Sequence, residues 1–335
     1  MRISSSHAGT DPGRKRRINE DSFVIAPPLF AVADGMGGAQ AGEVASALAA
    51  GALEESGANG GGERRVAELI QEANRRVHQR ATTDAATAGM GTTITAALVE
   101  HDGRVVFGHV GDSRAYLLRD DKLEQLTNDH TLVAELVRRG ELSPGEAQVH
   151  PQRSVITRAL GTDPDVDIDT FAVDAQPGDV YLICSDGLSS MVDSRDIEEI
   201  VRKYRSDLEG ASKALIQAAN RGGGEDNITA VLFAVEDGDP IGAEAGAPDE
   251  HTREFALVPE EEDTLHPEDG IAPPPSSPSA VDTMVVPAAD IQAAIAAQAG
   301  QDAPQAGIGR RFLALLVILA LVAVIVVLVW WGLAR

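Results

Sequence analysis

One stretch near the carboxyl end of the chain restricts its fold more than any other feature. Residues 312–331 are twenty consecutive apolar residues that carry no charge. A helix of that length rises about 1.5 Å per residue and crosses a hydrocarbon core of about 30 Å. In a water-soluble domain the same helix, apolar on every side, would have to be covered by protein all round. The sequence therefore predicts a transmembrane helix over residues 312–331.

The residues that flank this span predict its orientation. Arg310 and Arg311 precede it, Trp330 and Trp331 close it at an interfacial depth, and four residues follow. Because basic residues favour the cytoplasmic side, two arginines before the span against one after it place the large amino-terminal part in the cytoplasm. The first twenty residues hold no apolar stretch, which fits neither a secretory nor a twin-arginine export signal. We expect a single-pass protein of the inner (plasma) membrane.

A change of composition precedes the span. Residues 237–309 hold 15 Asp and Glu against one Arg, a net charge of −14, and 10 of the chain's 17 prolines. Like-charge repulsion and few apolar residues prevent such a stretch from forming a packed core. We therefore predict three parts. They are a folded domain over 1–236, an acidic Pro/Ala-rich disordered linker over 237–309 and a C-terminal transmembrane anchor over 310–335.

Charge and cysteine content exclude two classes of protein. A formal net charge of −24 argues against nucleic-acid binding, which requires clustered Lys and Arg. The chain has one cysteine, Cys184, so it cannot contain an intrachain disulfide framework. Cys184 ends an apolar run over 180–184, where we expect it to be buried in a strand.

Hydrophobic periodicity predicts an α+β fold. Short apolar runs predict strands at 22–26, 29–33, 93–100, 105–110, 115–118, 180–183 and 229–235. Longer segments with helical periodicity predict helices at 40–56, 63–81, 130–139, 195–204 and 210–220. The Asp102-Gly103 turn makes the run over 93–118 hairpin-like, which favours antiparallel sheets. Helices arrive in pairs between strand runs, so we predict a four-layer α-β-β-α sandwich, two antiparallel sheets flanked by helices.

Short acidic motifs recur at the ends of these strands. They are Arg16-Arg-Ile-Asn-Glu20-Asp21, Asp34-Gly35-Met-Gly-Gly38, Val110-Gly-Asp112-Ser-Arg114, Ser185-Asp186-Gly187 and Glu225-Asp226-Asn227. A single Asp-Gly pair is only a turn, in which the glycine lets the backbone bend sharply. Five acidic strand ends instead indicate carboxylates that point into one shared cleft.

Converging carboxylates predict bound metal ions. Like charges in a cleft raise one another's pKa, and divalent cations neutralise them. All-oxygen ligands favour magnesium or manganese, and the chain has no Cys/His spacing typical of zinc or copper sites. Two such ions about 3.5–4 Å apart lower the pKa of a bridging water toward ~7 and hold a phosphoryl oxygen. Arg16 or Arg17 is placed to bind two oxygens of a phosphate monoester. A covalent cysteine mechanism is poorly supported, because Ser190 stands six positions after Cys184 where a phosphate-binding arginine is needed.

The acidic motifs, in the order in which they occur along the chain, resemble those of the protein phosphatase 2C (PPM-type) family. The resemblance is strongest to its bacterial membrane-tethered members that oppose Ser/Thr kinases. The resemblance covers about residues 7 to 236. It also includes Gly91-Thr-Thr93, His150-Pro-Gln-Arg-Ser154, Ile156-Thr-Arg-Ala-Leu-Gly161 and Gly222-Gly-Gly-Glu-Asp-Asn-Ile228. It implies a cytoplasmic, metal-dependent protein serine/threonine phosphatase. Such an enzyme hydrolyses phosphoSer and phosphoThr monoesters with a metal-activated water and Mn²⁺ or Mg²⁺, and its partners are phosphorylated proteins, including a Ser/Thr kinase.

The resemblance implies ligands for two ions. Asp34 would bridge both ions, and the carbonyl of Gly35 would bind one of them. Asp186 together with Asp226 would complete the other. These four residues come from three different strand ends, so the implied site depends on the whole domain being folded.

Further positions would surround these ions. Glu20 and Asp21 would hold waters on the metals. As bacterial relatives suggest, Asp112 and Ser154 would join Asp186 around a third ion. The implied centre therefore holds two ions or three.

The substrate side of the implied site departs from eukaryotic relatives. Arg16 would bind the substrate phosphate, with Arg17 as the alternative if the register slips by one. Residues 130–160 resemble the family's mobile flap beside the cleft. Met36 stands where eukaryotic relatives carry a histidine, a proposed general acid. Methionine cannot donate a proton, so we assign no general acid.

Three other functions remain open on the sequence. The first is a phosphatase dedicated to one anti-sigma-antagonist partner, although no sensor domain typical of such proteins is visible. The second is an inactive membrane-tethered adaptor that binds phosphoproteins, although every implied metal ligand is present. The third, an exported calcium-binding protein, would more often gather its carboxylates in one short loop.

Overall fold

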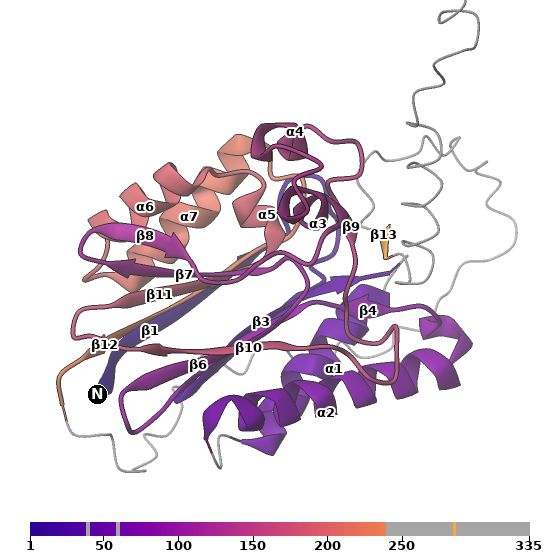
Figure 1. Cartoon of the computed structure of the whole chain (residues 1–335), viewed down its shortest axis with the longest axis horizontal. Coiled ribbons are helices and arrows are strands. Elements are labelled where there is room, and N and C mark those ends of the chain that lie inside the picture. The colour runs from indigo at the N-terminus through magenta and orange to yellow at the C-terminus, as the bar shows by residue number, and fades with distance from the viewer. Residues whose placement is uncertain (38–40, 58–60, 239–283, 286–335) are drawn as a thin grey trace, which may run out of the picture. The chain divides into compact units, whose positions relative to one another are not determined.

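The computed structural model describes residues 1–37, 41–57, 61–238 and 284–285. In these ranges two β-sheets pack face to face and helices cover their outer faces (Figure 1). The predicted span over 312–331 and almost all of the predicted linker lie outside these ranges. Among the helices that are described, none combines the length and apolar character needed to cross a membrane.

The first sheet has five strands. In spatial order they are β1 (Arg2–Asp11), β12 (Ile228–Glu236), β11 (Val180–Cys184), β7 (Arg114–Arg119) and β8 (Lys122–Gln125). All neighbours are antiparallel, and β1 pairs with β12 along its whole length. Helices α6 (Ser194–Lys203) and α7 (Leu208–Gly222) cover the outer face, and the short α5 (Asp186–Ser189) follows β11.

The second sheet is also antiparallel. Its strands are β10 (Asp169–Asp174), β6 (Arg104–Val110), β5 (Ile94–Val99), β3 (Leu29–Met36) and β2 (Asp21–Ala26), with β4 (Gly91–Thr92) paired to the end of β3. Helices α1 (Ala41–Ser56) and α2 (Gly62–Thr83) cover its outer face, and the 3₁₀ turn η1 (Ala85–Thr87) follows α2. The predicted antiparallel sandwich with helices outside is confirmed.

The segment between β8 and β10 lies beside the ends of the sheets. It contains α3 (Leu132–Arg138), α4 (Pro144–Gln148) and β9 (Val155–Ile156), and β13 (Met284–Val285) pairs with β9 in parallel. A capping box at Ser143 and Glu146 begins α4. The segment is held at its base, where the backbone N–H of Thr157 donates to the carbonyl of His130.

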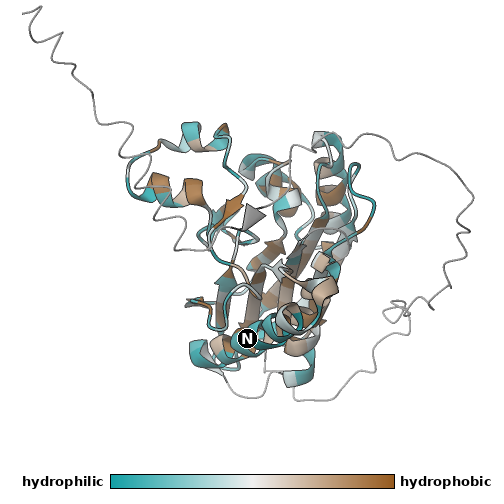
Figure 2. Ribbon diagram, turned by 90° about the vertical axis from the view of Figure 1, so that its right-hand side faces the viewer, coloured by the Kyte–Doolittle hydropathy of each residue, from teal (hydrophilic) through white to brown (hydrophobic). Residues whose placement is uncertain are grey.

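Aromatic side chains fill the space between the two sheets. Phe30 of β3 stacks on Phe233 of β12 with ring centroids 4.3 Å apart, and Tyr181 of β11 stacks on the same ring at 4.9 Å. All three side chains are fully buried. Figure 2 shows the hydrophobic strands enclosed by helices whose outer faces are largely hydrophilic. This inter-sheet core fixes the relative position of strands whose ends carry the acidic motifs.

Two sequence predictions need correction. The hairpin around Asp102-Gly103 is confirmed as β5–β6, but its extension to residue 118 is wrong, because β7 belongs to the other sheet. Gly111, at φ +114°, lets the chain pass from one sheet to the other in a conformation that side chains rarely adopt. Strands β1, β8 and β10 were not predicted, because they are sheet edges whose mixed polar sequences lack a continuous apolar run.

Removing one ring from the inter-sheet core should destabilise the domain without affecting its surface. We expect Phe233→Ala to lower the free energy of unfolding of residues 1–238 by about 3–5 kcal/mol, because the cavity would lie between two stacked rings. Urea unfolding followed by circular dichroism measures this. Val149→Ala, at a side chain that is 79% exposed, is the control and should change stability by less than about 0.5 kcal/mol. Equal effects of the two substitutions would contradict the proposed core.

Candidate metal centre

Asp34 lies at the centre of the acidic motifs. It sits in β3 opposite Asp21 of β2, so both carboxylates emerge from the same end of the second sheet. The carbonyl oxygen of Asp34 accepts hydrogen bonds from the backbone N–H of Thr93 at 2.9 Å and from the hydroxyl of Thr92 at 2.8 Å. Its own N–H donates to the hydroxyl of Thr93 at 3.0 Å. The backbone that carries this carboxylate is therefore held rigidly.

Close backbone approach explains the glycines that follow Asp34 and Asp186. A Cβ on Gly35 would lie 2.2 Å from the carbonyl oxygen of Gly42, and one on Gly187 would lie 2.0 Å from that of Asn227. Neither glycine is among the positive-φ residues, so a sharp left-handed turn is not their role. The sequence interpretation of these Asp-Gly pairs as turns is therefore wrong in mechanism. The glycines let separate strand ends touch.

Asp21 is held by the first sheet although it belongs to the second. One of its oxygens, Oδ2, accepts hydrogen bonds from the hydroxyls of Ser185 at 2.8 Å and Thr229 at 2.6 Å. The other oxygen, Oδ1, is buried and has no hydrogen-bond donor among the described residues. Burial raises the pKa of Asp21 to about 6, although the two hydroxyls oppose the rise. The buried acceptor without a donor is suited to a bound water or cation.

The charges of the acidic motifs act on one another. Burial raises the pKa of Asp34 well above its ordinary value, and four other aspartates raise it further. These are Asp21, Asp186, Asp226 and Asp112. The pKa of Asp186 is also raised, first by burial and then by three of the same carboxylates. The structure thus brings together the five predicted aspartates from the ends of both sheets.

Asp112 marks the side of the centre nearest the flap. Burial raises its pKa to about 7, and the charge of Asp129 adds to the rise. Arg114 opposes it only in part, because its guanidinium is already paired with Asp129 through hydrogen bonds of 2.9 and 2.6 Å. Asp112 is therefore poised to gain a proton or to meet a cation near neutral pH.

Arg16 is the cation beside the centre. Its Nη2 lies 3.0 Å from Oδ2 of Asp226, and its Nη1 lies 3.9 Å from Glu20. Burial raises the pKa of Glu20, whereas the charge of Arg16 lowers it. Arg17, the alternative considered on the sequence, is exposed. The register that includes Arg16 is therefore the one that faces the acidic centre.

Asn227 is a structural residue that the sequence did not single out. Its side-chain amide donates to the carbonyls of Pro12 and Ile18, and its side-chain oxygen accepts from the N–H of Glu20 at 2.8 Å. Asn227, the residue after Asp226, therefore ties the arginine-bearing loop to the start of β12. An Asn after an acidic pair gives no sequence signal of such a long-range contact.

The donors of this centre suit hard divalent cations. Among the described residues, no three His, Cys, Asp or Glu side chains form a ready-made ligand set around one ion. The centre is instead a group of buried carboxylates whose charges act on one another. Magnesium and manganese are bound in this way, through few carboxylates and several waters, rather than in closed protein cages. The residues therefore fit these ions.

The other predicted site positions lie farther out. Ser154 directly precedes β9 in the flap, and the structure records no hydrogen bond from it to the described aspartates. Met36 is buried against Ile156 and Ala159, so it packs the base of the flap. His109 is buried and bonded to the hydroxyl of Thr95, and its pKa is lowered to about 3 by burial. It therefore stays neutral and structural.

A four-layer α-β-β-α sandwich with carboxylates and one arginine at the ends of its sheets defines a metal-dependent hydrolase of phosphate esters. The family model "Protein phosphatase 2C" matches residues 15–228. The chain belongs to this family and is a protein serine/threonine phosphatase. A similar curated protein is the serine/threonine phosphatase stp of Listeria innocua, 42% identical over 235 residues that cover 67% of this chain and 92% of that protein.

Solved structures support the same conclusion. The serine/threonine phosphatase PstP/Ppp of Mycobacterium tuberculosis is similar with a TM-score of 0.66 and 40% identity, over 70% of this chain and 100% of that one. The catalytic domain of PstP in complex with two manganese ions has a TM-score of 0.64 and 38% identity, over 70% of this chain and 99% of that one. Because the aligned part accounts for nearly all of these solved chains, their equivalent of the domain folds without the remaining segments.

The raised pKa values predict how pH affects the metal-free domain. A carboxyl whose pKa is raised on folding stabilises the folded state below its unfolded pKa, and this stability is lost as pH rises through the folded pKa. For Asp112 the window runs from about 4 to about 7. In chelator, Asp112→Asn should therefore flatten the fall of the unfolding free energy across this window, by up to about 1.4 kcal/mol per pH unit.

Urea unfolding at several pH values measures this effect, with the exposed Asp163→Asn as the matched control. In the wild-type domain, manganese should restore the stability lost at pH 7 because it binds the ionised carboxylates of the folded state. The same pH dependence in Asp112→Asn and in the wild type would contradict the raised pKa of Asp112.

Proposed function

We propose that the acidic centre holds two manganese or magnesium ions, and that these ions and Arg16 together hydrolyse phosphoSer and phosphoThr monoesters. Asp34 and the Gly35 carbonyl would hold one ion, and Asp34, Asp186 and Asp226 the other. Ions bound there supply positive charge at the phosphate and lower the pKa of a water for attack on phosphorus. The complex of the PstP catalytic domain with two manganese ions supports this number.

The single observation that carries this proposal is the electrostatic state of Asp34. Burial raises the pKa of Asp34, and four aspartates from other strand ends raise it further. Arg16 forms an ion pair with one of them, Asp226. Charges gathered in this way are unfavourable unless cations neutralise them. A fold that gathers them nevertheless supports a metal-binding role.

The remaining residues have roles that follow from their contacts. Arg16 presents a planar fork beside Asp226 and would bind and orient two phosphate oxygens. Glu20 and Asp21 would hold waters on the ions, and the free Oδ1 of Asp21 supports that role. Asp112, with Ser154 from the flap, would serve a third ion. No side chain is assigned as the general acid, because Met36 cannot donate a proton.

Turnover tests the centre directly. We expect residues 1–236 to hydrolyse phosphothreonine peptides with added manganese and to lose this activity in chelator. Asp186→Asn or Asp34→Asn should lower kcat by at least about 100-fold, since each removes a proposed ligand, while the unfolding midpoint in chelator is kept or raised. Asp163→Asn is the matched surface control. A folded Asp186→Asn variant with full activity would refute the shared centre.

The same assay separates the phosphatase from its alternatives. A folded wild-type domain that binds phosphopeptides without turning them over would favour the inactive adaptor. Turnover confined to one phosphoprotein, with phosphothreonine peptides untouched, would favour the phosphatase of an anti-sigma antagonist. Turnover of many phosphoproteins, including a Ser/Thr kinase, fits the role proposed here, which is opposition to bacterial Ser/Thr kinases.

We further propose that residues 312–331 anchor the enzyme in the inner membrane with its catalytic domain in the cytoplasm. The apolar length of this segment and the arginines before it support the proposal. Protease added to intact cells should then leave the domain uncut, whereas protease added after lysis should cut the 237–309 linker. Cleavage of the domain on intact cells would instead indicate that the domain lies outside the cytoplasm. Deletion of residues 310–335 should release the protein from the membrane fraction.

A further inference from the structure

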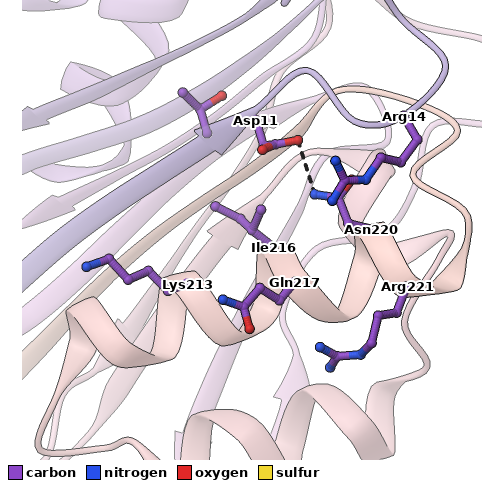
Figure 3. Close-up of a pocket in the computed structure, with 8 residues that line it drawn as sticks. Asp11, Arg14, Lys213, Ile216, Gln217, Asn220 and Arg221 are labelled. Carbon is purple, nitrogen blue, oxygen red and sulfur yellow. Dashed lines mark hydrogen bonds between the residues drawn. The ribbon is translucent and has the colours of Figure 1, made fainter.

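A hollow of about 530 Å³ lies outside the acidic centre, between the end of β1 and the side of α7 that faces this strand (Figure 3). Three basic residues line it, Arg14, Lys213 and Arg221, against one carboxylate, Asp11. Figure 3 shows Arg14 and Arg221 at one end of the hollow and Lys213 at the other. A local excess of positive charge is unusual in this chain, whose net charge is −24.

The two arginines are available for a ligand. Lys213 is already paired with Glu209 at 2.5 Å. Neither Arg14 nor Arg221 forms an ion pair with any residue that the structure describes, and both are exposed. Each therefore keeps a planar set of N–H donors that matches a carboxylate or a phosphate.

The one carboxylate in the hollow is held by the protein itself. Oδ1 of Asp11 accepts hydrogen bonds from the N–H of Gly13 at 2.9 Å and from the side-chain amide of Asn220 at 3.1 Å. These bonds fix Asp11 against the loop and the helix, so its charge is partly satisfied there. The open side of the hollow is therefore dominated by the arginines.

The hollow is directly beside the acidic centre. Arg14 precedes Arg16 by two residues, so their Cα atoms are at most about 7 Å apart. The N–H groups of Arg14 and Lys15 both donate to the carbonyl of Gly224, which stands two residues before Asp226. The two loops that line one end of the hollow thus continue into the acidic centre.

We propose that this hollow is a specificity subsite that binds an acidic side chain of the phosphoprotein substrate. An extended peptide advances about 3.3–3.6 Å per residue, so the side chain it binds lies about two to four residues from the phosphorylated one. The subsite rests on the proposed phosphatase activity and adds a preference among substrates. Its occupant is the substrate rather than an ion alone, because the hollow also has an apolar wall at Ile216 that suits the stem of a Glu side chain.

Paired peptides test the subsite. One phosphothreonine peptide carries Glu two to four residues from the phosphothreonine on both sides, and its partner carries Gln there. With manganese, residues 1–238 should show kcat/KM about fivefold higher for the Glu peptide, the effect of one or two partly exposed ion pairs. Arg221→Gln should remove most of this preference while leaving hydrolysis of p-nitrophenyl phosphate unchanged. Arg221→Glu should reverse it toward a peptide with Lys at the same positions.

Arg202→Gln is the matched control, because Arg202 is an exposed arginine near the end of α6 and lies outside the hollow. It should keep the preference of the wild type. Equal rates on the two peptides, or the same loss in Arg202→Gln and Arg221→Gln, would overturn the subsite while leaving the phosphatase intact. Absence of any turnover, p-nitrophenyl phosphate included, would instead overturn the phosphatase and the subsite with it.

The full-length chain distinguishes the substrate from the chain's own acidic segment. If Arg221→Gln raised the rate of the full chain on p-nitrophenyl phosphate and on the Gln peptide, the hollow would hold residues within 237–309, and the subsite would be refuted. We expect the full chain and residues 1–238 to show the same preference. The preference should also shrink as salt is raised from about 0.05 to 0.5 M, because both arginines are exposed.

Discussion

Repulsion among buried carboxylates is the constraint on which the catalytic end of this fold depends. Asp34 and Asp186 come from different sheets, yet the charge of Asp186 raises the pKa of Asp34, and the charge of Asp21, the neighbour of Asp34, raises the pKa of Asp186. In water such groups would separate. They stay together because the strands that carry them are fixed elsewhere, so the cost of gathering charge is met by packing far from the charge itself.

Two features hold the strand ends in place. The aromatic stack of Phe30, Tyr181 and Phe233 locks the two sheets face to face. At the ends of the sheets, Gly35 and Gly187 allow backbone to approach backbone where a single methyl group would collide. The core thus sets the distance between the sheets, and the glycines allow the acidic ends to meet. Cations need only neutralise a geometry that the apolar core has already formed.

Much of this arrangement could be predicted from the sequence, for physical reasons. Buried strands such as β11 and β12 are continuous apolar runs, and α2 has a clear helical period, so these elements were predicted close to their observed bounds. The edge strand β1 was missed because seven of its ten residues are polar and its pairing partner lies more than 200 residues away. The residue pattern within a short stretch of sequence does not show which distant strand it will pair with.

The site was predicted unevenly for the same reason. Acidic residues at strand ends can be recognised within a short stretch of sequence, and the structure brings the predicted aspartates close enough to affect one another's pKa. Asn227 was missed, because its role consists of hydrogen bonds to Pro12 and Ile18 across the fold. The Asp-Gly pairs were recognised but explained wrongly, since a turn and a close approach both require glycine. Only the position of the opposing backbone distinguishes the two.

The distribution of charge links the site to its substrates. Residues 1–236 carry 37 acidic and 24 basic side chains, so the domain as a whole repels phosphorylated proteins. Arg16 beside Asp226 and the arginines of the nearby hollow, Arg14 and Arg221, supply positive charge close to the acidic centre. Screening by salt weakens the repulsion of the exposed faces more than the attraction of the half-buried Arg16 for a phosphate. An acidic domain with arginines beside its metal centre would thus orient an anionic substrate before contact forms.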